Sequence, residues 1–199
     1  MSDSISPVDP ARTILLVMDY QTGILGMVAD PDALVARAAD AIAKVRYGGG
    51  HVGFVRVAFI DADYAAIPER NKGFSAAKAS GRNFSADSPA TAIDQRIAPK
   101  DGDVVVRKTR VGAFSTTGLA EQLAQRGIDT LILAGISTSG VVLSTIRDAA
   151  DHDYRLLVIA DACADPQADV HTLLLEKVFP RQADVITIAD LDAVLATAS

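Results

Sequence analysis

The sequence predicts an α/β protein: a six-stranded, mostly parallel, doubly wound sheet with helices on both faces. Short runs rich in Val, Ile and Leu alternate along the chain with Ala-rich helical segments, and strands covered on both faces read as continuous apolar runs of this kind. The length of 199 residues, with 49% hydrophobic and 22% charged residues, also suits one continuous core. We therefore expect a single domain over residues 13–199, preceded by a flexible segment, 1–12.

Six apolar runs are expected to be the strands, since each is short and bounded by polar or turn residues. They are residues 13–18, 51–58, 104–107, 130–134, 156–160 and 185–188. The helices are expected between them, at 31–47, 117–126, 139–151, 168–178 and 191–197. Pro31 suits the first turn of its helix, and the glycines after Tyr47 suit its end.

The stretch 60–102 is the least regular part of the chain. Long loops in compact domains are usually functional. We expect this one to form a lid or a pocket wall, with one short helix near 89–97.

Composition disfavours several classes of partner. The net charge of −6 and the pI near 4.9 argue against nucleic acid, because binding to its backbone needs clustered Lys and Arg. The apolar runs are too short to cross a bilayer, and the first residues resemble no signal peptide, so neither a membrane nor secretion is expected. These observations predict a cytoplasmic protein.

One apparent cofactor motif has the wrong context. The stretch GGGHVG at 48–53 fits G-x-G-x-x-G, but it ends a predicted helix and enters a strand, whereas a dinucleotide motif follows a strand and opens a helix. We predict no cofactor.

Polar groups follow three of the predicted strands at their carboxyl ends, where doubly wound sheets bind ligands. Asp19 ends the run TILLVM, Lys108 follows the third strand, and the stretch GISTSGVV follows the fourth. A carboxylate at the end of such an apolar run needs a partner to stay charged, and Lys108 is the candidate. The alternative is that Asp19 caps a turn and that Lys108 is a surface charge.

The elbow, residues 135–142, leaves a strand and enters a helix, so its free backbone N–H groups can bind a carbonyl oxygen or a carboxylate. The simpler alternative is that Thr138 or Ser139 only caps the helix. The single cysteine, Cys163, follows a predicted buried strand and is expected to pack as a small apolar residue.

In order and spacing these motifs resemble the isochorismatase-like, or cysteine hydrolase, superfamily, which includes nicotinamidases, N-carbamoyl amidohydrolases and isochorismatases. The resemblance rests on LLVMDYQ, VVRKTRVGAFSTTGL, LILAGISTSGVVLSTIRDA and VIADACAD. It implies a three-layer α/β/α sandwich with an Asp, a Lys and a Cys at the site. The first two fall on Asp19 and Lys108, as catalytic residues.

The cysteine of the family falls on Val141, six residues after Gly135 and seven before Asp148. Valine offers no nucleophile, so thioester chemistry is not expected. The Asp-His metal ligands of nicotinamidases are missing after the second strand, so we predict no metal. The resemblance also implies a cis peptide between Ile136 and Ser137, with the N–H groups of Ser137 and Val141 as oxyanion donors.

Isochorismatases resemble this chain in lacking the cysteine. They have glycine there, and the Asp acts as general acid toward a vinyl ether without a covalent step. Gly140 lies one position away, so a local shift of register would restore the likeness. A serine of the elbow as nucleophile is an alternative, but the histidines His51, His152 and His171 are poorly placed to serve as its base.

Substrate binding is assigned to residues around this centre. Cationic side chains of the loop and of the third strand suit an anionic group, although they equally suit a solvated, charged lid. Phenylalanines suit apolar walls. The predicted set is Gln21, Phe59, Arg70, Lys72, Arg110, Phe114 and Gly140.

Two functions follow for this chain. The first is a hydrolase of a small molecule that can carry a carboxylate, with Asp19 as general acid/base and Lys108 as its charge partner; like many of its relatives, it is expected to form a homo-oligomer, a dimer or tetramer. The second is a non-catalytic protein on the same fold that binds a small molecule or a partner.

Overall fold

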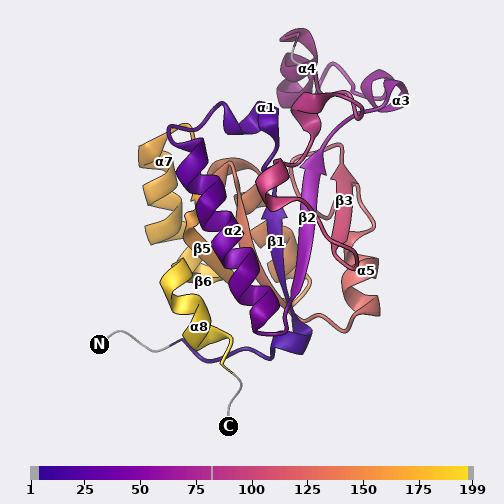
Figure 1. Ribbon diagram of the computed structural model, residues 1–199. Coiled ribbons are helices and arrows are strands. Elements are labelled where there is room, and N and C mark those ends of the chain that lie inside the picture. Colours follow the sequence, from indigo (N-terminus) through magenta and orange to yellow (C-terminus); the bar gives the residue numbers. More distant parts are fainter. Residues whose placement is uncertain (1–4, 82, 197–199) are drawn as a thin grey trace.

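The protein is an α/β/α sandwich around one sheet (Figure 1). The computed structural model describes residues 5–81 and 83–196. Six strands lie in the order β3-β2-β1-β4-β5-β6, and every neighbouring pair is parallel. The chain starts in the centre with β1, runs outward to β3, and returns to the other side of β1 with β4. The order reverses between β1 and β4, so the predicted doubly wound fold is confirmed.

All six predicted strands are present, with shifted ends. Their bounds are Thr13–Met18 (β1), His51–Val57 (β2), Val104–Lys108 (β3), Thr130–Ile136 (β4), Arg155–Ala164 (β5) and Asp184–Ile186 (β6). The largest difference is at the ends of β4 and β5, which remain paired as far as Ile136 and Ala164 after a register shift beyond Leu133. Gly135 lies beside Met18, the last residue of β1, so the elbow begins at the carboxyl end of β1.

Helices cover both faces of the sheet (Figure 1). One core lies under α2, Pro31–Tyr47, and α8, Leu191–Val194, and includes Val35 and Ala38. The other core lies under α5, Leu119–Gln125, and α6, Leu143–Asp151, and includes Leu123 and Ile146. Val170 of α7, Ala168–Leu173, packs against this second core.

Several predicted helices are shorter than expected. The segment 139–151 begins with a π-helical turn, Thr138–Val142, and α6 starts only after it. Likewise α7 passes into a π-helical turn, Leu174–Val178, and a 3₁₀ turn that contains Pro180, which has no N–H to continue a helix. The last helix, α8, ends at Val194; Thr197, the predicted end, lies outside the described residues.

The stretch 60–102 contains more helix than expected, in two helices at the carboxyl end of the sheet (Figure 1). These are α3, Asp61–Ala65, and α4, Lys72–Ala79. The helix expected near 89–97 is instead two 3₁₀ turns, Pro89–Thr91 and Gln95–Ile97. A further short helix, α1, Thr22–Leu25, follows β1 and had no sequence signal.

Part of the segment 1–12 packs against the domain. Residues 1–4 lie outside the described residues, but Val8 is buried and its N–H donates to the carbonyl of Val194. Pro10 is buried in a 3₁₀ turn, Pro10–Arg12, that leads into β1. Within 5–81 and 83–196, no helix combines the length and apolar character needed to span a membrane.

Candidate active site

Asp19 stands at the first turn after β1, in a backbone conformation that is uncommon for a residue with a side chain. Its φ is 61°, in the left-handed region that Asp tolerates better than most residues. Two hydrogen bonds of 2.8 Å hold this turn, one from the Asp19 N–H to the Val55 carbonyl and one from the Gln21 N–H to the Asp19 carbonyl. The carboxylate is therefore fixed at the carboxyl edge of the sheet.

Lys108, the last residue of β3, reaches this carboxylate. Its Nζ lies 2.7 Å from Asp19 Oδ2 and also donates to the Val111 carbonyl at 2.7 Å. Both side chains are buried, with exposed fractions of 3% for Lys108 and 6% for Asp19. The other carboxylate oxygen, Oδ1, is buried and accepts no hydrogen bond from the described residues, because the N–H of Val57, which lies near the Asp19 carboxylate, donates to Gln21 Oε1 at 2.8 Å.

Burial raises the pKa of Asp19 above its usual range, and the positive charge of Lys108 offsets part of this rise. A carboxyl group in this position keeps its proton to a higher pH than an exposed one. The group is therefore suited to exchange a proton with a ligand.

The elbow after β4 faces the same space. The peptide between Ile136 and Ser137 is cis, as the family resemblance implies. Ser137, Gly140 and Val141 line one pocket with Asp19 and Lys108. A Cβ at position 140 would lie 2.7 Å from the Ser137 Oγ, so a larger residue there would displace the Ser137 hydroxyl.

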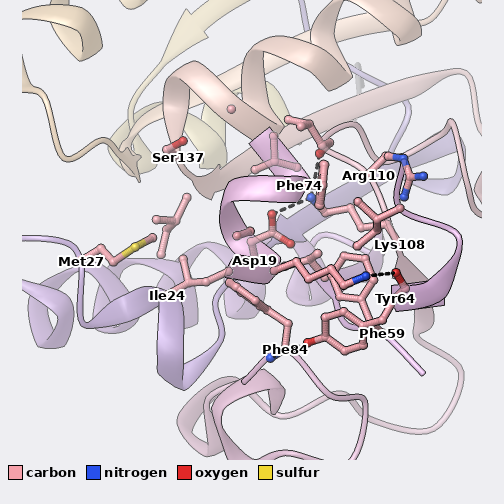
Figure 2. Close-up of a pocket in the computed structure, with 18 residues that line it drawn as sticks. Asp19, Ile24, Met27, Phe59, Tyr64, Phe74, Phe84, Lys108, Arg110 and Ser137 are labelled. Atoms are coloured by element: carbon pink, nitrogen blue, oxygen red, sulfur yellow. Dashed lines mark hydrogen bonds and ion pairs between the residues drawn. The ribbon is translucent and has the colours of Figure 1, made fainter. Parts of the chain in front are cut away.

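Aromatic side chains from α3, α4 and their flanking loops form the opposite wall of the pocket (Figure 2). The ring of Phe59 is surrounded by three others, with centroid distances of 5.0 Å to Tyr64, 5.8 Å to Phe74 and 6.4 Å to Phe84. The guanidinium of Arg110 lies over Phe74, 5.5 Å from the ring centroid. The cavity volume of the pocket is about 200 Å³, and the pocket is open to solvent on one side.

Four predicted substrate-binding residues lie elsewhere. Gln21 is a buried structural residue whose side-chain amide bonds the backbone of Val57 and the carbonyl of Thr91. Phe114 instead packs into the core on the other face of the sheet, where its ring stacks on Tyr154. Arg70 and Lys72 are exposed and do not line the pocket.

The remaining predicted residues, Phe59, Arg110 and Gly140, do line the pocket, as do others without a sequence signal. Tyr64 and Phe84 were missed because aromatic residues in an irregular loop indicate no particular face. Ile24, in α1, and Met27, just after it, were missed because α1 itself had no sequence signal.

Nucleophiles near the pocket are few. Cys163 lies on β5, is buried, and does not line the pocket; burial raises the pKa of its thiol to about 12. Ser137 lines the pocket, but the ring contacts of the described histidines lie elsewhere: His51 with Ala11, His152 with Phe114 and His171 with Thr138.

Over the part of the chain that the structure describes, no group of three or more His, Cys, Asp or Glu side chains could hold a metal ion.

Comparison with known proteins places this arrangement in a family. The family model described as the isochorismatase domain matches residues 13–190. Among relatives, the chain is 37% identical to the uncharacterized isochorismatase family protein YecD of Escherichia coli O157:H7, over 90% of this chain and 94% of that one. It is 33% identical to a probable isochorismatase of Pseudomonas chlororaphis, over 90% and 84% of the two chains.

A solved structure agrees. The isochorismatase family protein of Burkholderia thailandensis superposes with a TM-score of 0.81 at 29% identity, covering 96% of this chain and 99% of that one. The matched region contains β1 to β6 and all the residues of the pocket. The chain therefore belongs to the isochorismatase family.

Proposed function

We propose that this protein hydrolyses a small molecule with Asp19 as general acid and base, Lys108 as its charge partner, and no cysteine nucleophile. The observation that carries the proposal is that the two oxygens of the Asp19 carboxyl group have different surroundings. Oδ2 is 2.7 Å from the Lys108 ammonium, whereas Oδ1 has no partner among the described residues, and the residue lines the pocket. A buried polar atom without a partner is costly, so it marks a place where a ligand would be stabilised.

A proton cycle on Asp19 would suffice for hydrolysis of a vinyl ether. The carboxyl group gives its proton to the vinyl carbon, and water adds to the oxocarbenium carbon that results. The carboxylate then accepts a proton from the added water, and the hemiketal breaks down into an alcohol and a ketone. The raised pKa of Asp19 favours the protonated state that begins this cycle.

Thiol chemistry is left out of the proposal for two reasons. Val141, at the position where the family carries its cysteine, offers the pocket only methyl groups and its backbone. Cys163 is the single cysteine of the sequence, and its raised pKa keeps it a thiol at neutral pH. We assign the N–H groups of Ser137 and Val141 as donors for an oxygen of the substrate.

The walls of the pocket favour a flat, apolar body with an anionic group. The rings of Phe59, Phe74 and Phe84 offer faces and edges for stacking. Arg110 and Lys78 are the other cationic side chains that line the pocket within the described residues, besides the paired Lys108. Arg70 and Lys72 lie outside the pocket, and Lys78 donates to the Tyr64 carbonyl at 3.2 Å. We therefore assign recognition of a carboxylate to Arg110.

We also propose self-association as a dimer or tetramer and a cytoplasmic location. Self-association is proposed because many members of the family that the chain resembles form oligomers. Light scattering on a size-exclusion column tests it. The location follows from composition, and the net charge of −6 supports a partner other than nucleic acid.

The test is a substrate panel of isochorismate, simpler vinyl ethers, amides and esters, assayed with the native protein and with Asp19→Asn. We expect turnover of a vinyl ether and a loss of at least about 100-fold in Asp19→Asn. Asp101→Asn, an exposed carboxyl before β3, is the matched control and should keep full activity.

Two results would overturn the proposal. Activity that survives Asp19→Asn contradicts the mechanism. Failure on the whole panel favours the second function, a non-catalytic binding protein on this fold. Val141→Cys adds a test of the remaining site, since a gain of amidase activity would show that the donors and the Asp19–Lys108 pair are placed for acyl transfer.

A further inference from the structure

The elbow has two sides, and only one faces the pocket. Ser137, Gly140 and Val141 line the pocket. Thr138 and Ser139, which lie between Ser137 and Gly140, instead hydrogen bond to residues outside the pocket. The hydroxyl of Thr138 lies 2.8 Å from His171 Nδ1, and the N–H of Ser139 donates to Asp165 Oδ2 at 2.8 Å. Both partners come from the segment that follows β5.

Asp165 links the elbow to the sheet. It directly follows Ala164, which pairs with Ile136 at the end of β4, so the carboxylate starts from a fixed strand end. Its second oxygen, Oδ1, accepts the N–H of Gln167 at 3.1 Å and fixes the turn into α7. A single side chain therefore connects the last pair of the sheet, the start of α7 and the second residue of the π-helical turn.

His171 supplies the second link, from the last turn of α7. Burial lowers the pKa of its ring, and the nearby Asp165 carboxylate offsets part of this effect. The ring is therefore neutral at pH 7, with one nitrogen as acceptor and one as donor. Thr138 is fully buried, so loss of the ring would leave its hydroxyl without this partner.

We infer that Asp165 and His171 are positioning residues, which hold the elbow at the distance from Asp19 that the reaction requires. This inference rests on the proposed function of the same pocket. Neither residue lies among those that line the pocket with Asp19, so both act through Thr138 and Ser139. Among the described residues, the hydrogen bonds that hold Thr138 and Ser139 come from these two side chains, and displacement of a reacting group by about 1 Å can cost 100-fold in rate.

The kinetic test is a double-mutant cycle of Thr138→Val and His171→Ala, with the best substrate from the panel. Each single variant should lower kcat about ten-fold or more with KM nearly unchanged, and the double variant should be no worse than either, because both remove one interaction. His171→Asn, whose amide can occupy the place of Nδ1, should recover most of the rate. His51→Ala, a histidine at the opposite edge of the sheet with a hydrogen bond to Ala11, is the control.

The structural test needs no substrate. Hydrogen exchange at the amides of residues 139–142 should become at least ten-fold faster in His171→Ala and in Asp165→Ala, and should stay native in His51→Ala and nearly native in His171→Asn. Circular dichroism and thermal melting confirm that each variant is folded.

The two proposals fail in different ways. A silent substrate panel overturns the proposed hydrolysis, and the exchange rates alone then decide whether the elbow depends on Asp165 and His171. Additive effects in the cycle, or native exchange at the elbow in His171→Ala, overturn the positioning role even if the protein is an active hydrolase.

Discussion

Asp19 and Lys108 form an ion pair of 2.7 Å. Their strands, β1 and β3, are not neighbours, since β2 lies between them. The pair therefore spans the carboxyl end of β2, where Val57 lines the pocket. The chain turns at Asp19 through a φ of 61°, and Lys108 extends from the last residue of its strand. Both charges are buried, so each depends on the other.

Removal of Lys108 should destabilise the fold in a manner that depends on pH. Lys108→Met leaves the Asp19 carboxylate buried without its counter-charge, which costs about 3–5 kcal/mol when the carboxylate is ionised. Because the pKa of Asp19 is raised in the folded state, its contribution to stability is present at low pH and is lost as pH rises through that pKa. Lys108→Met should enlarge this loss.

Urea unfolding of the native protein and of Lys108→Met at pH 5 and pH 8 measures the effect. The difference in the free energy of unfolding should be larger at pH 8. Lys100→Met, an exposed lysine before β3, is the control. Equal destabilisation at both pH values would show that lost packing, rather than the charge, accounts for the effect.

The activity should also fall with rising pH. If protonated Asp19 starts the reaction, kcat/KM for a vinyl ether is highest below the pKa of Asp19 in the free enzyme and declines above it. The decline should occur at a higher pH than an exposed carboxyl would give, because burial raises this pKa. In Lys108→Met, which lacks the charge that lowers the pKa, the decline should move to still higher pH. A profile that rises with pH through this range would identify a base instead.

Val141 should limit the size of the substrate. Its side chain is buried and lines the pocket, whereas the next residue, Val142, is buried in the core and does not line it. Val141→Ala and Val142→Ala should each lower the free energy of unfolding by about 2 kcal/mol, since each removes two buried methyl groups. Only Val141→Ala should raise kcat/KM for substrates with a bulkier reacting end. A shared change in substrate range would show a general loosening of the elbow.

The contact between Asp19 and Lys108 was predictable from the sequence because sheet geometry brings strand ends together. Asp19, Lys108 and the elbow each follow a strand, and parallel strands bring these ends to one edge. The faces of loops were not predictable. Phe114 follows Lys108 by only six residues, yet the chain crosses to the opposite face between them. The backbone turns between Lys108 and Phe114 decide this crossing, and they produce no pattern of apolar residues in the sequence from which it could be predicted.

The helices α3 and α4 show a second limit of prediction from the sequence. No residue of α3 or α4 is fully buried, so these helices lack the apolar periodicity that reveals a helix packed on a core. Each helix instead packs on the core through one aromatic ring, Tyr64 or Phe74. Polar contacts add to this, such as that of Arg107 with Asp63 at 2.5 Å and that of Lys78 with the Tyr64 carbonyl at 3.2 Å. Which cations face the pocket follows from these contacts rather than from charge alone.

Arg110 should therefore differ from Arg70 in its effect on binding. Arg110 lines the pocket over Phe74, and Arg70 is exposed outside it, so the pair offers a matched comparison. Arg110→Ala should raise KM for a carboxylated substrate about 10- to 100-fold, the loss of one charge-assisted hydrogen bond of about 1.5–3 kcal/mol. An uncharged analogue should lose little, and Arg70→Ala should bind both ligands as the native protein does. Equal losses for the charged and uncharged ligands would assign Arg110 to the packing of Phe74 instead of to recognition of the carboxylate.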